Sequence, residues 1–71
     1  MNSINPKKLH HSKWTAVKPI NKEKHFLITD VEFDEEGRVI ACEIEAILSH
    51  RTTQIQWQSL KDETLWQQGW H

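Results

Sequence analysis

Hydrophobic and polar residues alternate most clearly in the middle of the chain, where they predict a β-hairpin. Residues 25–33 (HFLITDVEF) and 38–49 (RVIACEIEAILS) are rich in β-branched and aromatic side chains. The segment 34–37 (DEEG) between them suits a type I turn with glycine at a left-handed position. In the second strand the even-numbered residues are apolar, and Glu43 and Glu45 face the other way. We therefore expect an inward row made of Ile40, Cys42, Ile44, Ala46 and Leu48.

The register of this hairpin stays open, because the first strand has apolar residues on both faces. A two-residue turn pairs Leu27 with Ile44 and unites the apolar faces of the two strands. A bulge at the turn glycine instead pairs Ile28 with Ile44 and Phe33 with Val39, and glutamates in the turn favour this second register. A strand that shifts its buried face midway would reconcile the two patterns.

Shorter patterns flank the hairpin. Residues 13–19 (KWTAVKP) predict a short edge strand that ends at Pro19, since proline cannot donate to a β-ladder. Residues 52–58 (TTQIQWQ) alternate with glutamines, which is typical of a half-buried strand. Residues 60–68 (LKDETLWQQ) predict a helix of about two turns, capped by Ser59 and stopped at Gly69. The sequence thus predicts one mostly β domain over residues 1–71, with residues 1–12 as a flexible arm. We expect a curled antiparallel sheet of three or four strands with a short C-terminal helix, and an α+β arrangement is the alternative.

Chain length gives the large aromatic rings unusual weight. A domain of 71 residues buries only about 60 % of its unfolded surface. Each buried tryptophan or phenylalanine removes about 150–250 Å² from water. We therefore interpret the four tryptophans as core residues. Trp57, Trp66 and Trp70 should join the end of the chain to the hairpin, with at most one of them left to contact something else.

Cysteine content and hydropathy indicate a cytoplasmic protein. Cys42 is the only cysteine, so no intramolecular disulfide can form and a reducing compartment is expected. No apolar run approaches the roughly 20 residues of a membrane span, and the amino end lacks a signal-peptide core. We expect no contact with a membrane.

Charge is unevenly distributed although the net charge is only −1. Six lysines against Glu23 give residues 1–25 a charge of +5, and seven carboxylates against Arg38 give residues 26–50 a charge of −6. Such asymmetry is typical of a basic arm for nucleic acid. The alternative, which we favour, is a lysine-rich segment lying along an acidic hairpin of the same chain.

Three stretches of the sequence, NPKKLHHSKWTAV, KHFLI and WQSLKDETLWQQGW, resemble a bacterial tryptophan-rich family of small proteins without an established function. The residues that carry the resemblance are Ser12, Lys13, Trp14, Thr15, Lys24, His25, Phe26, Leu60, Asp62, Trp66, Gly69 and Trp70. They span nearly the entire chain, which suggests a complete protein. The resemblance implies no substrate, cofactor or catalytic residue.

Residues with catalytic or metal-binding chemistry are present but form no motif. The five histidines are dispersed and a single cysteine cannot complete a structural zinc site. Cys42 lies between Ile40 and Ile44, where an inert core thiol is expected. Glu43 and Glu45 share one strand face, which solvation explains. We predict no catalytic residue, no metal and no cofactor, and hence no enzyme.

The leading hypothesis is a small non-enzymatic binding or assembly module. An edge strand near Trp14 could pair with a protein partner or with a second copy in a dimer. The alternative is binding of single-stranded nucleic acid, which combines a basic groove with stacking aromatic rings. The candidate binding surface for that alternative consists of Lys7, Lys8, Lys13, Trp14, Lys18 and Trp70.

Overall fold

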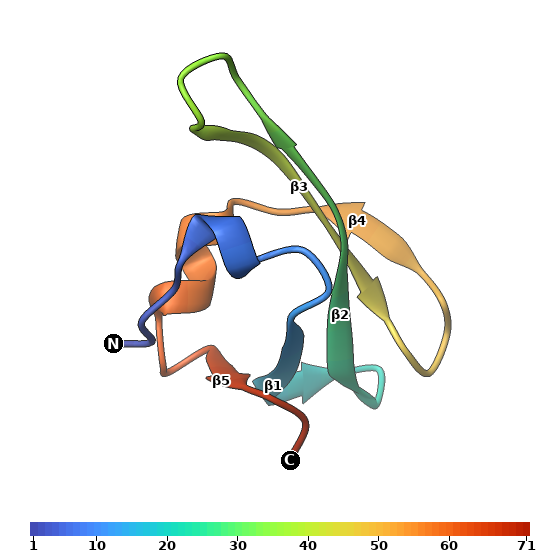
Figure 1. Ribbon diagram of the computed structural model, residues 1–71. Coiled ribbons are helices and arrows are strands. Elements are labelled where there is room, and N and C mark those ends of the chain that lie inside the picture. The colour runs from blue at the N-terminus through green and yellow to red at the C-terminus, as the bar shows by residue number, and fades with distance from the viewer.

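Five antiparallel strands form one open sheet in the computed structural model, which describes residues 1–71 (Figure 1). The strands are β1 (Lys13–Ile20), β2 (Glu23–Phe33), β3 (Val39–Ala46), β4 (Thr52–Gln54) and β5 (Trp66–Gln68). Their order across the sheet is β4-β3-β2-β1-β5. Two short 3-10 helices, η1 (Pro6–Lys8) and η2 (Trp57–Lys61), complete the fold. The mostly β prediction is confirmed, with five strands in place of three or four. No helix is long and apolar enough to cross a membrane.

The predicted hairpin is β2 and β3, and both of its ends have the second of the two registers considered, since Leu27 pairs with Glu45 and not with Ile44. Ile28 pairs with Ile44 and Phe33 with Val39, as a bulge at the turn requires. Between these pairs the register is shifted by one residue, because Thr29 in β2 and Ile40 in β3 have no opposite partner. Two bulges in one hairpin increase its twist, and the strands bend away from the rest of the sheet. Gly37 closes the turn with a φ of +80°.

The inward row expected on β3 is correct only in its middle. Cys42, Ile44 and Ala46 are buried, as predicted. Ile40 is 63 % exposed because it is the unpaired bulge residue of β3. Leu48 is 68 % exposed because β3 ends at Ala46 and the chain has already entered a turn. The predictions that Ile40 and Leu48 point inward are therefore wrong.

The predicted C-terminal helix is absent, and a turn and a strand replace it. The Asp62 carboxylate accepts hydrogen bonds from the backbone N–H of Thr64 at 2.9 Å and from its hydroxyl at 2.6 Å, which reverses the chain. Residues 66–68 then pair with β1, opposite Trp14, Thr15 and Ala16. A nine-residue helix is marginal in water. Pairing with β1 gains a ladder of hydrogen bonds and also places the Trp66 ring 5.2 Å from that of Phe26, edge to face.

This pairing also corrects the position of β1. Residues 13–19 were expected to form an edge strand, but β1 lies between β2 and β5. The edges of the sheet are the two three-residue strands β4 and β5. Such short edge strands leave few unpaired backbone N–H and C=O groups, so they offer little opportunity for pairing with a partner strand.

The half-buried strand expected over residues 52–58 is also shorter than predicted. Only β4 is extended against β3, after which the backbone N–H of Ile55 donates to the Cys42 carbonyl at 2.9 Å. The chain then turns into η2, with Gln56 at its N-cap and Ser59 within it, so Ser59 caps no helix. The gain from this turn is the burial of Leu60, which is completely inaccessible to solvent.

The core lies on one face of the sheet, under η1 and η2. Its members are Leu9, Trp14, Ile28, Cys42, Ile44 and Leu60. Trp14 is 2 % exposed, and its indole N–H donates to the Ser12 hydroxyl at 2.8 Å. That hydroxyl donates in turn to the Leu9 carbonyl at 2.6 Å. Tryptophan is thus a core residue at position 14. Trp57 and Trp66 are half-buried and pack on the core.

Residues 1–12 pack against the body of the domain. Leu9 belongs to the core, and the Asn2 side-chain amide donates to the carbonyls of Leu60 and Trp66, both at 2.8 Å. Asn5 caps the start of η1, and its side chain accepts a hydrogen bond from the Lys7 backbone N–H. The flexibility expected of this arm stays a prediction, as does the single-domain boundary.

Candidate functional site

An apolar groove of about 400 Å³ opens on the same sheet face as the core. It crosses β1, β2, β3 and the segment that follows β4, and the turn before β5 closes one side. Eight of its twelve lining residues are hydrophobic. The lining residues are Ala16, Lys18, Ile20, Glu23, Phe26, Ile44, Ala46, Arg51, Thr53, Ile55, Leu65 and Trp66.

The groove exists because the 3-10 helices cover only half of this face. Leu9 and Leu60 cover the half that carries Trp14 and Ile28. Side chains on one face of an antiparallel sheet lie opposite one another across the strands, so Ala16 and Trp66, which pair between β1 and β5, continue the same apolar surface. No segment of the chain covers that second half. We call this surface the open groove.

An ion pair between a buried carboxylate and an exposed guanidinium group lies at one end of the open groove. Glu23 is only 6 % exposed, and its carboxylate accepts hydrogen bonds from the Ser49 hydroxyl and the Arg51 guanidinium. The Ser49 hydrogen bond is the largest cause that lowers the pKa of Glu23, and the Arg51 charge also lowers it, against an opposing effect of burial. Glu23 is therefore ionised and neutralised by its partner, and the two residues add no net charge to the groove.

A tight turn between β1 and β2 sets the rim of the open groove. Asn21 and Lys22 both adopt positive φ angles, 56° and 63°, which is the pattern of a type I′ turn. The turn pairs Ile20 with Glu23, and both line the groove. Lys22 therefore lies at the rim. The sequence INKEK suggested only a polar connection, because asparagine at the first turn position was the one signal of a hairpin.

Lys18 is the only one of the six candidate binding residues that lines the open groove. Its charge contributes to lowering the pKa of Asp62, after the larger effect of the hydrogen bonds from Thr64. The two side chains nevertheless form no ion pair within 4.0 Å. The Lys18 ammonium group is thus available to a bound partner.

Two other candidates, Lys13 and Trp70, lie together outside the open groove. Trp70 is 42 % exposed, and the Lys13 ammonium lies 4.8 Å from the centre of its ring. The indole N–H donates to the Phe26 carbonyl at 2.9 Å. Gly69, with a φ of +81°, turns the chain so that its carbonyl accepts from the Thr15 hydroxyl at 2.6 Å. Trp70 is therefore fixed on the surface as the most exposed indole.

The remaining candidates do not join this pair. Lys7 and Lys8 belong to η1 and are exposed. Trp14 is buried in the core, where its ring cannot stack on a base while the domain is folded. The structure therefore divides the candidate surface between η1, the core, the open groove and the Lys13–Trp70 pair.

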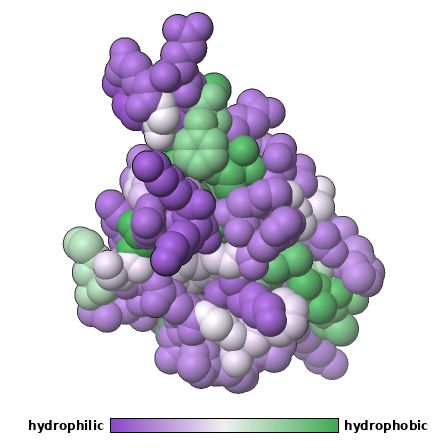
Figure 2. Space-filling view, in the orientation of Figure 1, coloured by the Kyte–Doolittle hydropathy of each residue, from purple (hydrophilic) through white to green (hydrophobic).

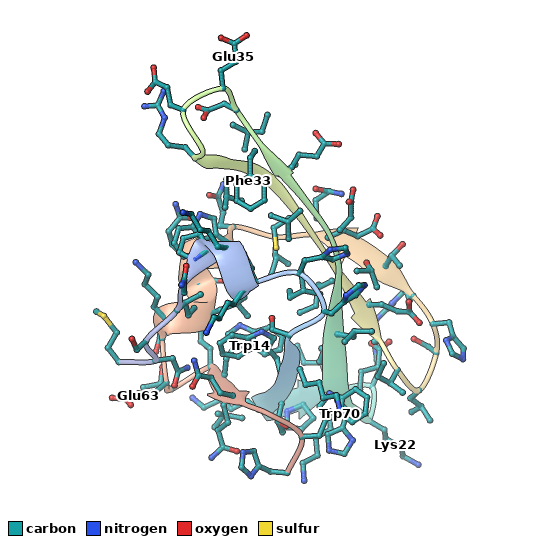
Figure 3. The ribbon with its side chains drawn as sticks, in the orientation of Figure 1. Trp14, Lys22, Phe33, Glu35, Glu63 and Trp70 are labelled. Carbon is teal, nitrogen blue, oxygen red and sulfur yellow. The ribbon has the colours of Figure 1, made fainter.

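The lysines do not neutralise the acidic hairpin. β1 lies beside β2, but at the end of the hairpin opposite the acidic turn, and no lysine forms a salt bridge. Within the turn, Arg38 pairs with Asp34 and Glu36, both at 3.0 Å. The lysine-rich segment therefore lies along the hairpin as expected, but only beside the end away from the acidic turn, so the basic and acidic regions lie at different ends. Figure 3 places Lys22 and Glu35 at these two ends.

The residues with catalytic or metal-binding chemistry have different surroundings in the fold. Burial raises the pKa of the Cys42 thiol, and Asp30 adds to the effect. His50 is exposed, and its Nδ1 lies 2.8 Å from a Glu45 carboxylate oxygen. No group of three or more histidine, cysteine or acidic side chains could hold a metal ion.

Among comparisons with known proteins, the one with models of sequence families finds a match. The model of a family described as "Tryptophan-rich protein (DUF2389)" matches residues 12–71. The match covers all four tryptophans and the whole sheet. No curated protein and no solved structure shows a significant match.

Proposed function

The chain belongs to the tryptophan-rich protein family DUF2389, whose function is unknown, and we propose from its geometry that it is a small non-enzymatic binding module. The observation that carries this proposal is the open groove, an apolar surface continuous with the core that no part of the chain covers. Such surfaces in a small domain are typical of interaction sites.

The chemistry of the open groove favours an apolar side chain of a protein partner. A cavity of about 150 Å³ lined by apolar residues holds a benzene ring, so the open groove has room for an aromatic ring and a neighbouring side chain. The one unpaired charged group in its lining is Lys18, because Glu23 and Arg51 neutralise each other. A partner with a carboxylate beside its apolar residue therefore fits best.

Titration with N-acetylphenylalanine amide, followed by NMR, tests this proposal. This compound presents one aromatic side chain with capped backbone, as a protein partner would. We expect saturable chemical-shift changes at residues that line the open groove, such as Ala46 and Ile55. Thr53→Trp fills the groove from an exposed position and should abolish the changes. Thr52→Trp is the matched control, because Thr52 is equally exposed on β4 but outside the lining. Shifts that do not saturate, or that lie elsewhere, would refute the proposal.

Binding of single-stranded nucleic acid is a second candidate, supported by the Lys13–Trp70 pair. A cation beside an exposed indole provides the charge and the stacking surface that such binding combines. A single-stranded oligonucleotide should then quench tryptophan fluorescence at low salt, and added salt should reverse the quenching. Trp70→Phe should remove the effect, whereas Trp57→Phe should retain it. Absence of quenching at low salt eliminates this candidate.

A further inference from the structure

We infer that the partner side chain in the open groove is Phe33 of a second copy of this protein, delivered by the tip of its β2–β3 hairpin. This inference rests on the proposed function, because it names the occupant of the same groove. Its support is a complementary pair of features at opposite ends of one molecule.

The donor feature is an exposed aromatic ring in an acidic setting. Phe33 is 43 % exposed at the end of β2, although it is one of only two phenylalanines in a chain short of core residues. Five carboxylates and one arginine give residues 30–41 a net charge of −4. The hairpin projects from the sheet in Figure 1, and Figure 2 shows hydrophobic surface directly below its hydrophilic tip. Figure 3 places Phe33 just below the turn that carries Glu35.

The acceptor feature is the open groove with its lysine rim. Four lysines and Glu23 give residues 13–24 a net charge of +3, and none of these lysines forms a salt bridge. Lys18 lines the groove, and Lys22 lies in the turn between two lining residues. An apolar ring flanked by carboxylates matches an apolar groove flanked by ammonium groups. Within one molecule no lysine forms an ion pair with a carboxylate of the hairpin, and a contact between two molecules brings these charges together.

The position of the two features determines the kind of assembly. The acidic tip and the lysine-rich turn lie at opposite ends of a molecule whose longest dimension is 37 Å (Figure 3). One copy can therefore donate its tip and accept another at the same time, which is a head-to-tail contact. A contact made by a hairpin tip is smaller than the roughly 1,200 Å² of a standard interface, so we expect weak, concentration-dependent association.

Sedimentation velocity over a concentration series tests this inference. We expect the wild-type protein to associate and several-fold weaker association at high ionic strength, since the rim charges are exposed. Phe33→Ser should weaken association about tenfold or more, as the loss of an aromatic anchor does. Leu48→Ser, which removes a more exposed apolar side chain outside the groove, is the matched control and should change little. Glu35→Lys, on the exposed turn, is a second donor variant that cannot disturb the core.

Mixing two non-associating variants gives the sharper result. Phe33→Ser retains an intact groove, and Thr53→Trp retains an intact tip. Each should be monomeric alone, and an equimolar mixture should form a one-to-one dimer, because each lacks what the other supplies. The control mixture of Phe33→Ser with the double variant Phe33→Ser/Thr53→Trp should stay monomeric. Circular dichroism melting of each variant verifies its fold.

Several outcomes overturn the inference. They are a monomeric wild type at every concentration, association that survives Phe33→Ser and Glu35→Lys, or a mixture that does not dimerise. The proposed function is tested separately by titrating N-acetylphenylalanine amide into Phe33→Ser, in which no second copy competes. If the compound binds the open groove while the wild type is monomeric, the binding function stands and the partner is another protein. If it does not bind, the proposed function fails as well.

Discussion

Substitution of Leu9 tests whether the amino-terminal arm is part of the fold. Leu9 is 1 % exposed and packs in the core, although it lies in a segment whose sequence has no regular pattern. Leucine-to-alanine changes at fully buried sites cost about 2–5 kcal/mol. The arm can move slightly toward the cavity that Leu9→Ala leaves, so we expect a cost of about 3 kcal/mol. At about 0.05–0.15 kcal/mol per residue, the whole domain has only about 4–11 kcal/mol of stability.

Urea denaturation, followed by tryptophan fluorescence, measures this cost. A loss of about 3 kcal/mol should also lower the Tm by about 12–24 °C in a domain of this size. Leu48→Ala is the matched control, because it removes the same atoms from an exposed position and should change stability by less than about 0.5 kcal/mol. If Leu9→Ala and Leu48→Ala shift the midpoint equally, the arm does not contribute to the core and our description of Leu9 is wrong.

Three further predictions follow from single groups. Cys42 is buried and its pKa is raised, so an aromatic disulfide reagent should label it only after denaturation. The pKa of Glu23 is lowered in the folded state, so on acidification the unfolded chain binds the proton of this carboxylate before the folded chain does. Stability should therefore fall as the pH drops from the ordinary pKa of 4.5 toward the lower pKa of the folded state. Thermal melts of Glu23→Gln should show a flatter pH dependence than those of the wild type. Trp70 is the most exposed indole, so acrylamide should quench Trp70→Phe less than the wild type, whereas Trp66→Phe should be quenched at least as strongly as the wild type.

The central hairpin could be predicted because its local signals agree. Alternation in β3 and the turn sequence ending in Gly37 both favour a hairpin at this position. The local signals disagreed only on register; the structure has the second register at both ends of the hairpin, and a bulge in each strand separates these ends from a shifted middle. Ambiguity in the sequence thus corresponded to an irregular ladder.

The carboxy-terminal segment could not be predicted because its local and long-range preferences conflict. Residues 60–68 contain good helix formers, and Gly69 is a suitable helix stop. Strand pairing wins because Trp66 reaches Phe26 only from an extended chain beside β1. Only Gly69 fulfils the role expected of it, as a residue with positive φ that ends an element.

The open groove was also invisible to sequence patterns, for a different reason. Its lining combines residues from β1, β2, β3, β4 and the turn before β5, so no single stretch shows it. Apolar residues there, such as Ala16 and Leu65, look the same in sequence whether a helix covers them or solvent does. The contacts of the charged residues could not be predicted for a similar reason, because the acidic and basic segments are adjacent in sequence but their ends lie apart in space.

The length of the chain explains why the open groove and the projecting hairpin occur together. After five strands are built, only η1, η2 and short connections remain to cover the sheet, and they suffice for one half of one face. Meanwhile the hairpin extends beyond the core, and Phe33 near its tip stays 43 % exposed. Trp70 does not cover the groove either, because its hydrogen bond to the Phe26 carbonyl holds it on the surface beside Lys13 and His25. The fold therefore leaves uncovered apolar surface and an exposed aromatic ring at separate places, and the proposed contact between two molecules would cover both.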